Sequence, residues 1–354
     1  MAIENKLLEL AAIYPEAQLE DYIKFLYQSA FGPGHFVADE TAGLARLEAE
    51  WAKTAAGGPF LEELSDEYVR VHIGGAKAAG LTVRTLFALF SRAAKAPQAD
   101  KMDCFLENIH SLPAMAKQGV LPFETQEAQT HIAAYIARGC PAQSHSEAYR
   151  QAYNPAYRLV GREAALFMPL FCYIDKQLAA GNSVTLNIEG GAATGKTTLA
   201  ALLAQVYGCA VVHMDDFFLQ PDQRTPARLA QVGGNIDYER FSREVTPHLG
   251  KGVPFSYRPF NCHTLAYGAP VNVPAHPLTV VEGCYSAHPK LAGPFHCSVF
   301  LKLAAQVQSA RILARGGSEM HARFMGEWVP KENDYFAWAD TQGKSMFTFD
   351  TAIL

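Results

Sequence analysis

The chain has 354 residues and a formal net charge of −5 at pH 7, with 49% hydrophobic and 18% charged residues. This composition is typical of a soluble globular protein with enough apolar material for two domains, and it excludes general disorder. Because an acidic balance provides no extended basic surface, we expect no nucleic-acid partner.

Targeting and redox signals are absent from the sequence pattern. The first apolar run, in MAIENKLLELAAIYPEA, contains acidic residues, so we expect no signal peptide. The longest uncharged apolar run, AALFMPLFCYI at 164–174, is far shorter than the roughly 20 residues that cross a bilayer, so we expect no membrane contact. Seven cysteines without a CxxC pair indicate reduced thiols in the cytoplasm rather than a zinc site. A homo-oligomer is compatible with this composition.

The first 165 residues are predicted to form a mostly α-helical domain. Apolar residues recur at steps of three and four over 5–14, 19–31, 82–95 and 127–139, which is the pattern of amphipathic helices. Glycine- and proline-containing segments separate them. We recognise no catalytic signature here, and the role of this domain stays open.

The second part of the chain has a different pattern. A long helical segment is predicted within 153–183, ending in a Gly-Asn turn. Strand-like runs then alternate with helical ones, as in a parallel sheet flanked by helices. The strands expected are 184–188, 209–214, 278–283 and 297–303, and helices are expected from Thr197 and over 304–315. We therefore predict a helical domain over 1–165 and an α/β domain over 166–354.

The stretch GGAATGKT at 190–197 satisfies the phosphate-loop (P-loop) pattern G-x-x-x-x-G-K-[ST] between a strand and a helix. Its glycines let backbone N–H groups converge on phosphate oxygens at a helix N-terminus. Lys196 is expected to contact the β- and γ-phosphates of ATP, and the Thr197 hydroxyl to ligate Mg²⁺. The residues expected to bind the nucleotide are Gly190, Gly191, Ala192, Ala193, Thr194, Gly195, Lys196, Thr197 and Thr198.

Two adjacent aspartates, Asp215 and Asp216, end the next predicted strand. They fall at the carboxyl edge of the sheet, where ligands of open α/β folds bind. Adjacent side chains on a strand point in opposite directions, so we expect one to face the site and the other to support the loop or the metal. An aspartate near the γ-phosphate can accept the proton of an attacking hydroxyl, and a capping role is the alternative.

Acidic and basic residues follow the later strands. Glu282 ends an apolar strand and is placed to hold Mg²⁺ directly or through water, with a solvated strand-end glutamate as the alternative. Arg311 and Arg315 are four residues apart on one helical face, and Arg323 lies beyond a Gly-Gly break. Arginines in this position can stabilise charge on a transferring phosphoryl group, although solvated surface arginines remain the alternative.

In this order GGAATGKTTLA, DDFF, VVEG and the arginine-bearing segment 311–323 resemble the uridine kinase and phosphoribulokinase group of P-loop kinases, over nearly all of 183–354. The resemblance implies an ATP- and Mg²⁺-dependent kinase. It implies that Asp215 acts on the substrate hydroxyl, that Glu282 assists the metal, and that Arg311 and Arg315 contact the phosphates. Thr197, Glu282 and Asp215 are the metal ligands we expect.

The sequence departs from uridine kinase between these landmarks, in the region where the group binds its acceptor. The segments concerned are 223–241 and 255–264. Polar or aromatic side chains here are candidates for recognising a hydroxylated acceptor, with a structural role for each as the alternative. These candidates are Asp216, Arg224, Asp237, Tyr257 and Arg258. Trp328, further along the chain, is expected in the core.

Three functional hypotheses follow from these patterns. The preferred one is a kinase for a hydroxyl of a small molecule, nucleoside-like or another hydroxylated metabolite, in which the helical domain covers the site, gives specificity or mediates assembly. The second is a regulatory P-loop ATPase or nucleotide switch whose helical domain binds a protein partner, with slow ATP hydrolysis that no acceptor accelerates. The third is a kinase for a protein or an RNA end, and the acidic balance disfavours the RNA version.

Overall fold

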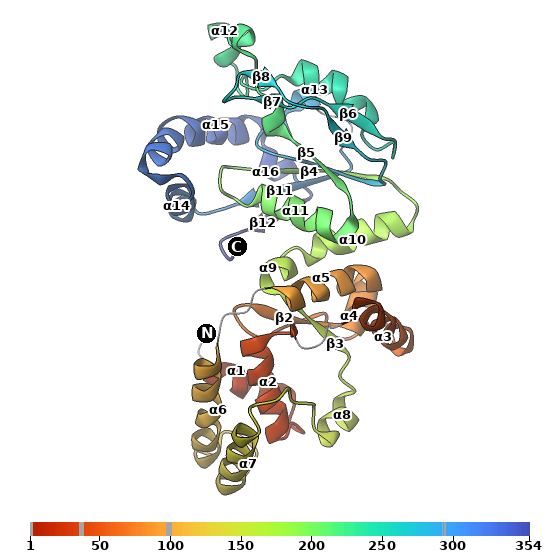
Figure 1. Cartoon of the computed structure of the whole chain (residues 1–354), viewed down its shortest axis with the longest axis vertical. Coiled ribbons are helices and arrows are strands. Elements are labelled where there is room, and N and C mark those ends of the chain that lie inside the picture. The colour runs from red at the N-terminus through yellow and green to blue at the C-terminus, as the bar shows by residue number, and fades with distance from the viewer. Residues whose placement is uncertain (1–2, 35–38, 97–100, 292, 294) are drawn as a thin grey trace. The chain divides into compact units, whose positions relative to one another are not determined.

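The computed structural model describes residues 3–34, 39–96, 101–291, 293 and 295–354. The chain divides into two compact units, Met1–Ala165 and Leu166–Leu354, and Figure 1 draws both. Within the described residues, no helix combines the length and the apolar character needed to cross a membrane.

The N-terminal unit consists of helices and one small sheet. Its helices are α1 (Ile3–Ile13), α2 (Leu19–Phe31), α3 (Glu40–Lys53), α4 (Ile73–Ala79), α5 (Val83–Lys95), α6 (Met102–Lys117), α7 (Thr125–Ala137), α8 (Glu147–Tyr153) and α9 (Arg162–Ala165). Its strands are β1 (Leu61–Glu63), β2 (Tyr68–His72) and β3 (Tyr157–Gly161). The helices expected from the apolar periodicity are present as α1, α2, α5 and α7.

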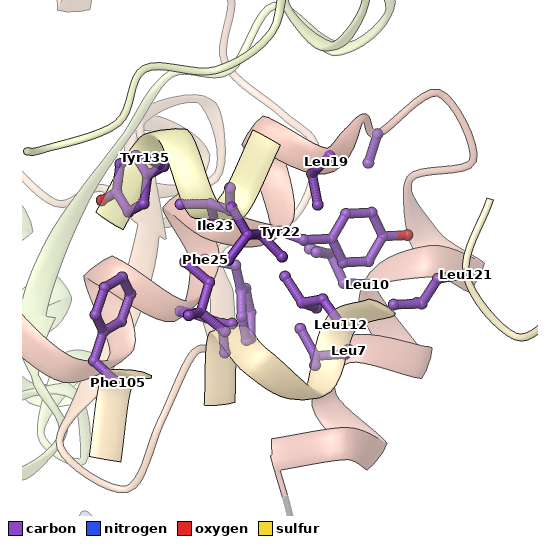
Figure 2. Packing of buried hydrophobic residues seen from close by; sticks show 14 of the residues in the cluster. Leu7, Leu10, Leu19, Tyr22, Ile23, Phe25, Phe105, Leu112, Leu121 and Tyr135 are labelled. Atoms are coloured by element: carbon purple, nitrogen blue, oxygen red, sulfur yellow. The ribbon is translucent and has the colours of Figure 1, made fainter. Parts of the chain in front are cut away.

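Helices α1, α2, α6 and α7 contribute to one apolar cluster of this unit, part of which Figure 2 shows. Leu7 of α1, Tyr22 and Ile23 of α2, Phe105 of α6 and Tyr135 of α7 are all fully buried in it. Each such side chain contributes about 1.5–3 kcal/mol when it leaves water. The cluster therefore explains why the three- and four-residue apolar spacing of these segments produces packed helices.

The small sheet was missed by the sequence analysis. Strands β1, β2 and β3 are antiparallel in that order, with Val69 opposite Val160 and His72 opposite Tyr157. The strands have only three to five residues, so the alternation of Val69, Arg70, Val71 and His72 in β2 is too short to stand out from the helical segments around it. The long helical segment expected within 153–183 is present only in its second part, as a helix over Met168–Ala179 that ends before the expected Gly-Asn turn, because β3 and the break after α9 interrupt the first part.

The C-terminal unit alternates strands and helices. Its helices are α10 (Met168–Ala179), α11 (Lys196–Tyr207), α12 (Pro226–Leu229), α13 (Tyr238–Glu244), α14 (Ala305–Arg323), α15 (Val329–Ala339) and α16 (Thr341–Lys344). Its strands are β4 (Val184–Gly190), β5 (Ala210–His213), β6 (Phe255–Tyr257), β7 (Phe260–Asn261), β8 (Ala266–Tyr267), β9 (Val271–Val273), β10 (Leu278–Glu282), β11 (Cys297–Lys302) and β12 (Phe347–Asp350).

The main sheet of this unit has the order β12-β11-β4-β10-β5, and every neighbouring pair is parallel. Helix α11 packs on β4, β5 and β10, whereas an apolar cluster joins residues of β5 and β10 to α13 and α15. The predicted parallel sheet flanked by helices is thus confirmed. Strand β12 and the antiparallel pairs β6-β9 and β7-β8 were not predicted, because each of these strands has only two to four residues.

Candidate active site

Three adjacent strands of the main sheet end at the site. Strand β10 lies between β4 and β5, and in this register Glu282 is opposite Ile188 on one side and His213 on the other. The P-loop starts where β4 ends, at Gly190. Because parallel strands place their carboxyl ends at one edge, the P-loop, Glu282 and His213 lie side by side.

Three residues of the P-loop have positive φ angles, a backbone conformation that glycine adopts easily. Gly190 and Gly195 have φ values of 147° and 91°, and Ala193 has a φ of 59°. A Cβ atom on Gly190 would lie 2.5 Å from the Leu301 carbonyl oxygen, so no other residue fits there. Lys196 is the first residue of α11, and its Nζ donates to the Gly191 carbonyl at 2.8 Å.

A hydroxyl group and a carboxylate group lie next to each other beside the P-loop. The Thr197 hydroxyl donates to Glu282 Oε1 at 3.2 Å, and His213 Nδ1 lies 2.6 Å from the same oxygen. This hydrogen bond raises the pKa of His213. In the described residues no group of three or more His, Cys, Asp or Glu side chains is arranged for a metal. A hydroxyl and one carboxylate nevertheless fit Mg²⁺, which commonly takes one or two carboxylates together with phosphate oxygens.

Asp215 and Asp216 have different surroundings. Asp215 is exposed to a cavity of about 1250 Å³, and burial among protein groups raises its pKa while the charge of Lys196 opposes the rise. The Asp216 carboxylate instead accepts a hydrogen bond from the hydroxyl of buried Tyr257 at 2.8 Å, and its carbonyl accepts one from Arg240. Only the first aspartate therefore faces the space next to the P-loop.

The same cavity brings together most of the residues expected at the nucleotide and the metal. Its wall includes Ala192, Ala193, Gly195, Lys196, Thr197, Thr198, Asp215, Glu282, Arg311 and Arg315. Gly190, Gly191 and Thr194 belong to the same loop but are not part of the cavity wall. The Thr194 hydroxyl donates to the Gly191 carbonyl at 2.8 Å. The cavity thus brings together a glycine-rich loop at a helix N-terminus, a lysine and a carboxylate.

The two predicted phosphate-contacting arginines lie on α14 at the cavity, but they are not equivalent. Arg311 Nη2 donates to the carbonyls of Thr351 and Leu354 at 2.8 and 2.7 Å, so its guanidinium already has partners. Arg315 is exposed and lies over the Phe324 ring at 5.5 Å. Arg315 therefore has more freedom than Arg311 to contact a ligand.

Of the five residues expected to contact the acceptor, only Arg224 is on the cavity wall. Besides Asp216 and Tyr257, which bond to each other, Asp237 is buried and caps α13 by accepting from the Arg240 N–H at 2.9 Å. Arg258 donates to the Gly268 carbonyl at 3.2 Å. These four side chains hold the segment together, and they lie outside the cavity wall.

Other residues of the cavity wall escaped the sequence analysis. Phe218 and Trp328 lie there with ring centroids 6.5 Å apart, and Trp328 is half-buried rather than in the core. The side-chain nitrogen of Asn235, also on the wall, is buried and has no hydrogen-bond partner in the described part of the chain. Phe218 belongs to the DDFF motif and was visible in the sequence, whereas no pattern links Trp328 or Asn235 to the P-loop.

Two buried glutamates adjoin the P-loop and were also missed. Glu189 accepts hydrogen bonds from the Gly190 N–H at 2.9 Å and the Tyr335 hydroxyl at 2.9 Å, and complete burial raises its pKa to about 7. Glu332 of α15 accepts from the Ala192 N–H at 2.8 Å, and burial raises its pKa as well. Glu189 was detectable as an acidic residue in an apolar strand, but Glu332 is 140 residues from its partner.

Comparison with protein-family models and with curated proteins gave no match. Among solved structures, the chain is similar to a protein named as a possible uridine kinase from Bacillus stearothermophilus, with 19% identity, a TM-score of 0.38, and coverage of 50% of this chain and 96% of that one. It is also similar to a protein named as a fructose transport system kinase from Silicibacter sp. TM1040, with 21% identity, a TM-score of 0.37, and coverage of 48% and 90%. A shikimate kinase from Bacteroides thetaiotaomicron has 14% identity, a TM-score of 0.24, and coverage of 48% and 86%. Each likeness covers about half of this chain.

Proposed function

We propose that the protein is an ATP- and Mg²⁺-dependent kinase that transfers the γ-phosphate to a hydroxyl of a small molecule. The observation that carries the proposal is the Asp215 carboxylate, which opens to the same cavity as Lys196 and the P-loop. A P-loop alone supports nucleotide binding, whereas a carboxylate in the same space also provides a proton acceptor for an attacking group.

In the proposed reaction the acceptor hydroxyl lies between Asp215 and the γ-phosphate. Asp215 takes the hydroxyl proton as the oxygen attacks phosphorus, the bond from phosphorus to the β,γ-bridging oxygen breaks, and ADP leaves with that electron pair. Lys196 and Arg315 stabilise negative charge on the phosphate oxygens. Burial favours the protonated form of Asp215, which strengthens it as a base.

Thr197, Glu282 and Asp215 are the residues proposed to hold Mg²⁺, which when bound neutralises phosphate charge. The 3.2 Å contact between the Thr197 hydroxyl and Glu282 supports the assignment for the first two. His213, 2.6 Å from the same Glu282 oxygen, keeps this carboxylate oriented toward the loop.

The acceptor is proposed to be a nucleoside-like compound or another hydroxylated metabolite. Phe218 and Trp328 present ring surfaces in the cavity, and Arg224 provides a hydrogen-bond donor. A ligand with a planar or apolar part and polar edges matches this wall.

All seven cysteines are free, which supports the proposed cytoplasmic location.

The test is an acceptor screen with purified protein, ATP and Mg²⁺ against nucleosides, vitamins, sugars and hydroxy acids. We expect ADP release that at least one acceptor increases, together with a product heavier by one phosphoryl group in mass spectrometry. Lys196→Ala should remove turnover, and Lys302→Ala, at an exposed lysine outside the cavity wall, should not. Slow ADP release that no acceptor increases would favour the regulatory ATPase instead.

A further inference from the structure

One residue of the P-loop has both of its backbone polar groups bound by side chains from distant parts of the sequence. The Ala192 N–H donates to Glu332 Oε2 at 2.8 Å, and the Ala192 carbonyl accepts from Gln308 Nε2 at 2.9 Å. Ala192 and Glu332 are only 7% and 8% exposed, so little water competes for these bonds. The two partners come from α15 and α14, respectively.

Packing around Ala192 reinforces the two hydrogen bonds. A Cβ atom on Gly191 would lie 2.8 Å from Gln308 Nε2 and 3.4 Å from Glu332 Oε2, so a glycine is needed for these side chains to approach. Ala192 also forms a small buried cluster with Ile312 of α14 and Val329 of α15. The loop is therefore attached to both helices by apolar as well as polar contacts.

A second attachment lies one turn further along α15. The Tyr335 hydroxyl donates to Glu189 at the end of β4, at 2.9 Å, and Tyr335 follows Glu332 by three residues on the same helical face. Glu189 directly precedes the P-loop. Helix α15 thus holds both the start of the loop and its third residue.

The segment between these attachments includes the parts of α14 and α15 that face the cavity. Arg315, Arg323 and Trp328 all lie on the cavity wall. Helix α14 is interrupted at Gly317, where φ is 71° and ψ is −176°, and a π-helical turn at Phe324–Trp328 connects α14 to α15. The segment from Gln308 to Glu332 is thus anchored to the P-loop at both ends and irregular in the middle.

We propose that Gln308 and Glu332 are positioning residues that couple nucleotide binding in the P-loop to the segment bearing Arg315, Arg323 and Trp328. This rests on the nucleotide binding proposed above. A bound triphosphate takes hydrogen bonds from P-loop N–H groups and brings negative charge beside the Glu332 carboxylate. Because Ala192 is tied to both helices, any adjustment of the loop changes the position of both ends of the segment.

The test uses Trp328 as a fluorescent reporter in the full chain with Trp51→Phe and Trp338→Phe, which leave it as the only tryptophan of three. The probe is the non-hydrolysable ATP analogue AMP-PNP with Mg²⁺, and its binding is measured separately by calorimetry. We expect AMP-PNP to change Trp328 emission in this reference protein. Glu332→Ala and Gln308→Ala should each lose most of that change, because each variant removes one of the two side-chain hydrogen bonds to Ala192.

Matched variants separate coupling from general damage. Glu332→Gln keeps an acceptor for the Ala192 N–H and should retain the Trp328 response, whereas Asn333→Ala and Gln306→Ala, at exposed positions of the same helices, should leave it unchanged. Gln308 is only half-buried, so Gln308→Ala gives a second reading if Glu332→Ala fails to fold. AMP-PNP binding without a Trp328 response in the reference protein, or a full response in both alanine variants, would overturn the coupling alone. No AMP-PNP binding at all would overturn the proposed function with it.

Discussion

Carboxylates with shifted pKa values occur in both units of the protein, but their partners differ. In the N-terminal unit Glu62 accepts hydrogen bonds from Arg70 at 2.8 Å and Tyr14 at 3.0 Å, and it lies 2.9 Å from His72. Burial alone would raise the pKa of Glu62, yet the charges of Arg70 and His72 and these hydrogen bonds lower it to about 2. The pKa of Asp21 is also lowered, because hydrogen bonds from His145 and Ser146 outweigh its burial.

The C-terminal unit shows the opposite shift. Burial raises the pKa values of Glu189, Asp215 and Glu332, and Lys196 is the one cation that opposes the rise at all three. A carboxylate matched by internal cations and donors stabilises the fold, whereas Asp215 and Glu332, which share one lysine beside the cavity, are destabilising unless a bound cation contributes to the balance. We therefore propose that the first group is structural and that Asp215, in the second group, serves the proposed chemistry.

The largest expected effect separates the two adjacent aspartates. Asp215→Asn should lower acceptor-dependent turnover by about 10²–10⁴-fold, the usual loss on removing a general base, while ATP still binds. Asp216→Asn keeps an oxygen that can accept from Tyr257 and should lower turnover by less than about tenfold. Initial rates and calorimetric ATP binding on both variants measure the difference. If Asp215→Asn transfers phosphate at the wild-type rate, the catalytic assignment is wrong.

The next effect concerns the structural network. Arg70 is 1% exposed, and besides its bond to Glu62 it donates to Gln28 at 2.9 Å and lies over the Tyr157 ring at 4.8 Å. Arg70→Met removes this buried cation and should cost the N-terminal unit about 3–5 kcal/mol of unfolding free energy.

The control is Arg150→Met, since Arg150 is half-exposed and its ion pair among the described residues is with Glu147, one turn away. It should cost less than about 0.5 kcal/mol. Hydrogen exchange of peptides from α2 in the full chain reports this unit separately from the other. Equal protection in both variants would mean that the Arg70 network contributes nothing to stability.

The sequence predicted the fold where its signals were local. The P-loop pattern, the strands ending at Asp215 and Glu282 and the helix from Ala304 all depend on nearby residues, and the parallel sheet follows from their order. The sheet of the N-terminal unit escaped because β1 and β2 are a short local pair and because β3 pairs with β2 from far along the chain, with Tyr68 opposite Gly161. No local periodicity records such a pairing.

The same limit applies to the candidate site. The sequence predicted which residues lie at the carboxyl edge of the sheet, including Lys196, Asp215 and Glu282. It did not indicate that Glu332 reaches the Ala192 N–H or that Trp328 lies opposite Phe218, because these contacts depend on how α15 packs. Residue type alone also suggested an acceptor role for Tyr257, whose hydroxyl is bonded to Asp216 instead.

Acid should weaken the structural network over a defined pH range. The folded-state pKa of Glu62, about 2, is below its ordinary value of 4.5, so its stabilisation is complete above pH 4.5 and is lost as the pH falls toward 2. Replacement by Gln should therefore cost about 3 kcal/mol of unfolding free energy at pH 7 and much less near pH 2. Hydrogen exchange of α2 peptides across this pH range measures the difference in unfolding free energy between the wild type and the Glu62→Gln variant. If this difference in unfolding free energy does not change with pH, the charge of Glu62 is not responsible for the stabilisation.

The smallest effect has the opposite sign and concerns Asp215. Its folded-state pKa is raised, so the ionised carboxylate costs stability once the pH exceeds that pKa, and the cost disappears as the pH falls below its ordinary value. Asp215→Asn should therefore stabilise the C-terminal unit at pH 8, by only about 0.5–1 kcal/mol because solvent in the cavity screens the charge. Hydrogen exchange of β4 peptides measures it, with Asp216→Asn as the control. A variant that loses phosphate transfer yet resists unfolding better than the wild type is the outcome expected of a carboxylate kept for chemistry, and destabilisation would place Asp215 with the structural carboxylates.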